Sequence, residues 1–158
     1  MHRKVAISIL SLCAIALPFC ASGTDKLDAA MLKGSEIPKD CKVIDGRYAT
    51  DLQTQILDKR YDLYKSMLPP LAGKQAQSFE CGKQKGTIFY FEYSSQADRA
   101  QAEEGIRHLL WGDDHATPEH PEQIEPVENV VLVFSFEKAP GLLLDAIRTK
   151  LQRVMNPT

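Results

Sequence analysis

The sequence predicts an α+β domain, with a small antiparallel sheet and helices packed on it. Two observations predict this class. Residues 87–93 and 127–136 are rich in β-branched and aromatic side chains, which favour strands. Several other segments repeat apolar residues at helical spacing and begin at residues suited to capping a helix. The chain therefore mixes both kinds of element within a single small domain.

The first 23 residues are typical of a secretory signal peptide. A basic start at residues 2–4 precedes an apolar stretch over 5–19 and a group of small residues. The stretch is about 15 residues, shorter than the roughly 20 that cross a bilayer as a helix. We therefore expect export to the periplasm or the medium, without a transmembrane segment. Because a lipidated cysteine normally follows a small residue, Phe19 argues against a lipid anchor at Cys20.

Removal of the signal peptide leaves two cysteines, Cys41 and Cys81. Two cysteines in an exported protein most simply form one disulfide. Closing a loop of about 40 residues would stabilise the fold by roughly 4 kcal/mol in the chain-entropy model. The same pairing would leave no thiol for a cysteine-based catalytic mechanism.

The mature chain is expected to form one domain, because about 135 residues are enough for a single core. Residues 24–40 are interpreted as an N-terminal arm or a short helix, and residues 41–158 as the α+β domain. The first strand is expected at 41–44. A helix follows over 50–68, beginning with a capping box at its first turn and ending before two consecutive prolines.

A β-hairpin is expected after this helix. Its first strand covers residues 76–81, a glycine-bounded loop covers 82–86, and the return strand covers 87–93. The aromatic residues of the return strand would form an open binding surface if one face of the sheet were uncovered. We favour the alternative, in which helices cover both faces of this strand and its aromatic residues belong to the core.

A second capping box at Ser95 and Asp98 opens a helix over residues 95–111, which Gly112 is placed to end. Residues 113–126 contain three prolines and lack apolar periodicity, so we expect a surface loop there. The strand at 127–136 is predicted to be the centre of the sheet. Pro140 begins a last helix.

The order of these elements suggests a topology. Strand, helix, strand, strand, helix and strand is the ferredoxin-like βαββαβ order, here followed by a C-terminal helix. It predicts at most four strands, with helices on one face. One conflict is evident: the first two strands are not neighbours in that topology, whereas a disulfide requires Cα atoms closer than about 7 Å. If both cannot hold, the disulfide is retained and Cys41 lies in a loop.

The charge of the mature chain bears on its partners. The 19 Lys and Arg include Arg3 and Lys4, so 17 remain against 21 Asp and Glu. No basic block occurs, which argues against nucleic acid and anionic membranes as partners. The acidic balance favours a basic protein.

Glutamates recur at every third position near the end of the expected loop. Interspersed prolines favour a polyproline II helix, which has three residues per turn and would align these carboxylates on one edge. They would lie roughly 9 Å apart, too far to share one calcium ion but suited to contacts with a basic protein. The alternative is an ordinary solvated loop. The candidate binding residues are Glu119, Glu122, Glu125 and Glu128.

Three histidines remain after processing, and two aspartates lie between them. Imidazoles and carboxylates together can bind zinc or copper. The spacing matches no compact ligand motif, however, so packing is the competing interpretation of His108. The candidate metal ligands are His108, His115 and His120.

No nucleophile elbow, P-loop or His-Glu-x-x-His motif occurs in the sequence. We therefore expect no enzyme and no cofactor. The function that the sequence favours is an exported binding or inhibitory module acting through contact with another protein, such as a cationic enzyme directed at the cell wall. The alternatives are a periplasmic protein that binds a small ligand or metal through residues 108–120, and an unrecognised hydrolase.

Overall fold

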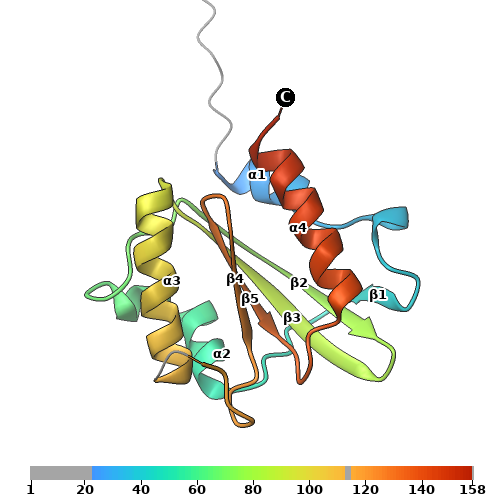
Figure 1. Cartoon of the computed structure of the whole chain (residues 1–158), viewed down its shortest axis with the longest axis horizontal. Helices are drawn as coiled ribbons and strands as arrows, with labels where there is room; N and C mark the ends of the chain where they lie inside the picture. The colour runs from blue at the N-terminus through green and yellow to red at the C-terminus, as the bar shows by residue number, and fades with distance from the viewer. Residues whose placement is uncertain (1–22, 113–114, 158) are drawn as a thin grey trace, which may run out of the picture.

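The computed structural model describes residues 23–112 and 115–157 (Figure 1). The predicted signal peptide up to residue 22, including Cys20, lies outside the described residues, as do Asp113 and Asp114. Among the helices of the described ranges, none has both the length and the apolar character needed to cross a membrane.

The centre of the fold is a five-stranded antiparallel sheet (Figure 1). The strands lie in the order β1, β2, β3, β5, β4, which makes β3 the central strand. The α+β class and the antiparallel sheet are thereby confirmed, whereas the limit of four strands is wrong. The strands are β1 (Cys41–Ile44), β2 (Gly73–Cys81), β3 (Gln84–Glu92), β4 (Gln123–Val127) and β5 (Val130–Ser135).

Helices cover both faces of this sheet, as favoured for the strand at 87–93, whereas the ferredoxin-like topology predicted one covered face (Figure 1). Helices α1 and α4 pack on one face, and α2 and α3 pack on the other. The helices are α1 (Gly23–Ala30), α2 (Leu52–Lys59), α3 (Gln96–Trp111) and α4 (Gly141–Met155), with short 3-10 helices η1 (Gly34–Glu36) and η2 (Tyr61–Tyr64).

The ferredoxin-like strand order is not confirmed, because β1 lies next to β2. This pairing removes the conflict between a strand at Cys41 and the disulfide. Cys41 lies directly opposite Cys81 across the two strands, with Cα atoms 4.1 Å apart, and the two are joined by a disulfide. The predicted strand and the predicted disulfide are both confirmed.

The prediction of a surface loop over residues 113–126 is wrong at its end. Gln123–Val127 forms the edge strand β4, which pairs with β5 through a tight hairpin. An edge strand tolerates Pro126, because its outer side needs no backbone N–H donor. The hairpin turn places Glu128 at φ 54°, a conformation that few residues other than glycine adopt. The strand predicted at 127–136 is thus β5, and it is second from the edge rather than central.

The helix predicted over 50–68 is shorter than expected. Asp51, rather than Thr50, caps it, because the Asp51 side chain accepts a hydrogen bond from the Thr54 backbone N–H at 2.7 Å. Helix α2 ends at Lys59, and η2 follows. The hydroxyl of Thr50 is therefore free to bond elsewhere.

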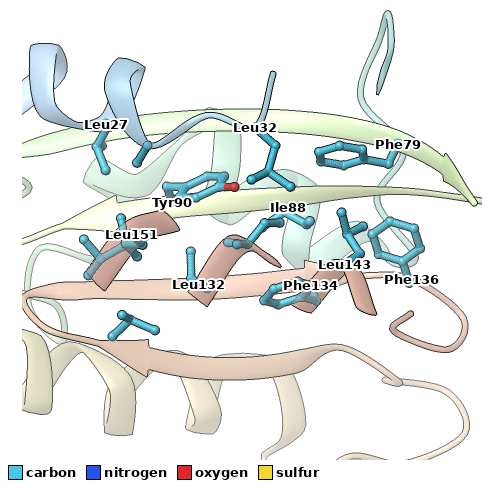
Figure 2. Close-up of a cluster of buried hydrophobic side chains, with 14 of the residues drawn as sticks. Leu27, Leu32, Phe79, Ile88, Tyr90, Leu132, Phe134, Phe136, Leu143 and Leu151 are labelled. Atoms are coloured by element: carbon cyan, nitrogen blue, oxygen red, sulfur yellow. The ribbon is translucent and has the colours of Figure 1, made fainter. Parts of the chain in front are cut away.

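The core between α1, α4 and the sheet is built mainly from apolar side chains, with the hydroxyl of Tyr90 buried among them (Figure 2). Helix α1 contributes Leu27 and Ala30, both fully buried. Helix α1 and Leu32 therefore pack against the sheet. The side chains that Figure 2 labels are Leu27, Leu32, Phe79, Ile88, Tyr90, Leu132, Phe134, Phe136, Leu143 and Leu151.

The second core lies under α2 and α3. Phe89 and Phe91 of β3 pack there, and the ring of Tyr61 stacks on Phe91 at 5.7 Å. Alternate residues of β3 thus point into two separate cores. The prediction that this aromatic strand is core on both faces is confirmed.

Candidate functional site

The sheet face under α2 and α3 ends in a row of buried hydroxyls, which we call the polar row: Ser78, Thr87 and Ser135. These residues are direct neighbours across β2, β3 and β5. Each is buried at a strand position that faces inward. Buried hydroxyls need hydrogen-bond partners, so the row predicts a polar structure above it.

That structure is the backbone of residues 46–50, which crosses the row just before α2. Each hydroxyl of the row forms a hydrogen bond with a backbone group of this segment. These backbone groups need such partners, because residues 46–50 have no regular secondary structure in which they could pair with one another. The segment is thereby held in one place on the sheet. The three bonds are Ser78 Oγ to the Gly46 carbonyl (2.6 Å), Tyr48 N–H to Thr87 Oγ1 (2.7 Å) and Thr50 N–H to Ser135 Oγ (2.7 Å).

Glu122 continues the polar row at its far end. The register of β4 and β5 places it next to Ser135, and its side chain is fully buried. One carboxylate oxygen, Oε1, accepts a hydrogen bond from the Thr50 hydroxyl, whose Oγ1 lies 2.9 Å from Ser135 Oγ. The other oxygen, Oε2, has no hydrogen-bond donor among the described residues.

Asp51 lies beside Glu122 and is oriented by its role as the cap of α2. Its carboxylate accepts the Thr54 backbone N–H at 2.7 Å and the Thr54 hydroxyl at 3.1 Å. His120 approaches from the loop before β4, with Nδ1 3.8 Å from Asp51 Oδ2. Asp51, His120 and Glu122 each offer one ligand atom, and these atoms lie within 4.8 Å of one another. We call these three residues the carboxylate-imidazole cluster.

The two carboxyl groups of the cluster have opposite pKa shifts. Burial raises the pKa of Glu122 to about 7, and the neighbouring Asp51 carboxylate acts in the same direction. Burial also acts to raise the pKa of Asp51, but the neighbouring Glu122 carboxyl and the hydrogen bonds from Thr54 outweigh it, so the pKa of Asp51 is lowered. Opposite shifts of this kind are typical of two neighbouring carboxyl groups that share one proton.

The four glutamates predicted as a binding edge do not form one exposed row. Only Glu119 is fully solvent-exposed, whereas Glu122 is buried. Glu125 accepts a hydrogen bond from Arg148 of α4 at 2.7 Å, and Glu128 lies in the hairpin turn. The reason is that β4 is a strand with alternating side chains and not a polyproline II helix. A binding role for these residues stays a prediction.

The three candidate metal-binding histidines are not brought together. His108 and His115 are exposed, and His120 is half-buried. Over residues 23–112 and 115–157, three His, Cys, Asp or Glu ligand atoms converge only at the carboxylate-imidazole cluster. His120 and Glu122 were thus both singled out by the sequence, but for two different sites. Asp51 was missed, although Thr87 and Ser135 at core-facing strand positions could have signalled a buried polar network.

A second feature follows Asp51 in the chain. Large apolar side chains are exposed here: Leu52 by 70%, Leu63 by 55% and Met67 by 39%. The amide of Gln53 donates to the Tyr64 hydroxyl at 2.7 Å and ties the first turn of α2 to η2. We call Leu52, Leu63, Met67 and the adjacent cavity the α2-η2 surface. The cavity has a volume of about 420 Å³ and is lined by Tyr61, Asp62, Lys65, Leu68, Pro69 and Pro70.

Comparison with known proteins provides no family assignment. No protein-family model, no curated protein and no solved structure matches the chain.

Proposed function

We propose that this chain is an exported, non-enzymatic binding module that acts by contact with another protein through the α2-η2 surface. The observation that carries the proposal is the exposure of Leu52, Leu63 and Met67 within sixteen consecutive residues. Single exposed leucines are common on soluble domains, whereas grouped apolar side chains mark sites of protein contact. Leu142 of α4 is 69% exposed as well, and with Ile37 and Pro38 it lines a separate cavity on the other side of the sheet.

The cavity beside these side chains supports the same use. Its wall combines the ring of Tyr61 with Leu68 and two consecutive prolines. Aromatic and apolar walls of this kind accept an apolar anchor from a partner, and such anchors supply most of the binding energy at protein interfaces. Asp62 and Lys65 at the rim provide charges of both signs for orientation.

Export is supported by the disulfide between Cys41 and Cys81. Disulfides persist in oxidising compartments and are rare in the cytosol. A periplasmic or secreted address, taken with the basic and apolar start of the chain, is part of the proposal. A basic partner is the class that the acidic balance of the mature chain favours.

The experiment is a capture assay with the mature protein immobilised and an extract of the periplasm of the producing cells. The double variant Leu52→Ser/Leu63→Ser should lose the captured protein, because it removes two of the exposed side chains. Leu142→Ser is the control, since it removes an equally exposed leucine from the other side of the sheet. This variant should still capture the protein. If the double variant captures the same protein as the wild type, the α2-η2 surface is not the contact site.

The salt dependence of capture tests the class of partner. Contacts with a basic partner at the rim should weaken at high ionic strength, because salt screens exposed charges. Capture that is unchanged by salt would favour a neutral, apolar contact instead.

A further inference from the structure

The carboxylate-imidazole cluster has no part in the proposed contact, and its chemistry requires its own explanation. Glu122 is fully buried, yet its Oε2 has no hydrogen-bond partner among the described residues. The ring atom Nδ1 of His120 is buried without a partner as well. Burying a polar atom without a partner costs free energy. Such atoms in a folded protein indicate that something else occupies the space between them.

The charges of the cluster show what kind of occupant fits. Within the described ranges, no lysine or arginine forms an ion pair with Asp51 or Glu122, and His120 is the single basic group near them. The buried carboxylate of Asp58 behaves differently, because Arg47 and Lys74 both pair with it. Two carboxylates in contact without a cation repel each other unless a proton or a metal ion lies between them.

We propose that Asp51, His120 and Glu122 bind one divalent transition metal ion, with zinc as the representative of the class. The donor set of one imidazole nitrogen and two carboxylate oxygens is one that zinc accepts. Calcium and magnesium are poorer candidates, because they require six or more oxygen ligands and do not favour imidazole. Two carboxylates also balance the double positive charge of the ion.

The distances between donors are close to those that zinc requires. Donors at about 2.0 to 2.2 Å from zinc in a tetrahedral arrangement lie roughly 3.3 Å from one another. Asp51 Oδ2 and His120 Nδ1 are 3.8 Å apart, and all three ligand atoms lie within 4.8 Å of one another. Small rotations of these side chains would bring the donors into range without moving the backbone.

The surrounding hydrogen bonds orient the two carboxylates. The backbone and hydroxyl of Thr54 hold Asp51, and the hydroxyl of Thr50 holds Glu122 through Oε1, so that Oε2 is left for a ligand. Ser135 in turn positions Thr50. Hydrogen bonds of this kind around metal ligands fix their orientation and raise metal affinity. The polar row would thus serve as the support of a metal site.

The cluster reaches solvent at one of its members. The side chain of His120 is 40% exposed, whereas Glu122 is fully buried.

The test is calorimetric titration of the metal-free mature protein with zinc chloride, and with calcium chloride in parallel. We expect one zinc ion per chain and no heat with calcium. Glu122→Gln and His120→Asn should each weaken zinc binding by at least about 100-fold, the upper end of what the loss of an outer hydrogen-bond partner costs. Glu119→Gln is the matched control, because Glu119 lies in the same loop, is exposed and is not part of the cluster.

A third variant keeps the zinc test decisive if one of the first two fails to fold. Asp51→Asn keeps a good helix cap, so it should retain the wild-type circular dichroism spectrum while losing zinc affinity. The absence of zinc heat in the wild type would overturn the proposal and leave a shared proton as the occupant. Unchanged zinc affinity in both His120→Asn and Asp51→Asn would overturn it as well. Leu52→Ser/Leu63→Ser should bind zinc normally, so this result is independent of the protein-contact proposal.

Discussion

The two faces of the sheet are built from the same strands but are completed in different ways. On the face covered by α1 and α4, the packed side chains are mainly apolar, with Tyr90 and Glu92 as the buried exceptions on β3. On the other face, the apolar pair Phe89 and Val133 is followed, two residues along β3 and β5, by the hydroxyl pair Thr87 and Ser135. Helix α2 has only eight residues, and the backbone of residues 46–50 covers the end of this face instead.

The comparison teaches why the polar residues lie where they do. A helix satisfies its own backbone groups and can cover an apolar surface. An irregular segment cannot, so the surface beneath it has to supply hydrogen-bond partners. The polar row supplies them, and the carboxylate-imidazole cluster lies where the row meets the cap of α2.

The largest expected effect is in the apolar core. Phe134→Ala should lower the free energy of unfolding by about 3–5 kcal/mol, because Phe134 is fully buried and its removal leaves a cavity. Urea unfolding followed by circular dichroism measures this. Leu142→Ala, at an exposed position, should change stability by less than about 0.5 kcal/mol. A loss below about 1 kcal/mol for Phe134→Ala would mean that this core is loosely packed.

The next effect is on the pH dependence of the free energy of unfolding, measured with a chelator present so that no metal is bound. Burial raises the pKa of Glu122 to about 7 from an ordinary value of 4.5, so the folded state binds more protons than the unfolded state between these values. Stability should therefore fall, by roughly 2–3 kcal/mol, as the pH rises from about 5 to 8. The lowered pKa of Asp51 has the opposite effect, but at pH values below this window. Glu122→Gln should flatten the profile, and a variant that keeps the full slope would contradict the assignment to Glu122.

A smaller effect is expected within the polar row. Ser135→Ala removes the acceptor of the Thr50 backbone N–H and a partner of the Thr50 hydroxyl. Leaving these buried groups unpaired should cost about 1–3 kcal/mol in the free energy of unfolding. Ser35→Ala, at an exposed serine, is the control. If both variants are equally stable, water replaces the lost hydrogen bonds, and solvent reaches the polar row.

The smallest effect is expected at the surface. Arg148 pairs with Glu125 across β4 and α4, and both side chains are partly exposed. Arg148→Ala should cost no more than about 1 kcal/mol, and less at high salt, because water and ions screen such pairs. Thermal unfolding at low and high salt measures it. A larger loss would place Arg148 among the groups that hold β4 on the sheet.

Local patterns predicted several elements correctly. The β-branched and aromatic residues from Thr87 onward predicted β3, the cap at Ser95 and the glycine at 112 bounded α3, and the two cysteines predicted the disulfide. Each of these depends on neighbouring residues or on the compartment. Edge strand β4 was missed, because Pro126 is unfavourable in strands generally and is acceptable only at an outer edge, which is a property of the finished sheet.

The candidate site was predicted only in part for the same reason. His120 and Glu122 were recognised as residues of interest, but their partner Asp51 is about seventy positions away in the sequence. Nothing local distinguishes Asp51 from an ordinary helix cap. The four glutamates do not form one exposed row, because burial, which removes Glu122 from the surface, depends on what covers each position.

The amino-acid sequence alone determined the periodicity of the strands, the starts of the helices and the residues able to form the disulfide, because these follow from interactions over a few residues and from cysteine number. Only the tertiary structure decided the strand order, the coverage of both faces and the meeting of Asp51, His120 and Glu122. These depend on contacts between distant segments, where packing and hydrogen bonding between many groups select one arrangement from several that the local patterns allow.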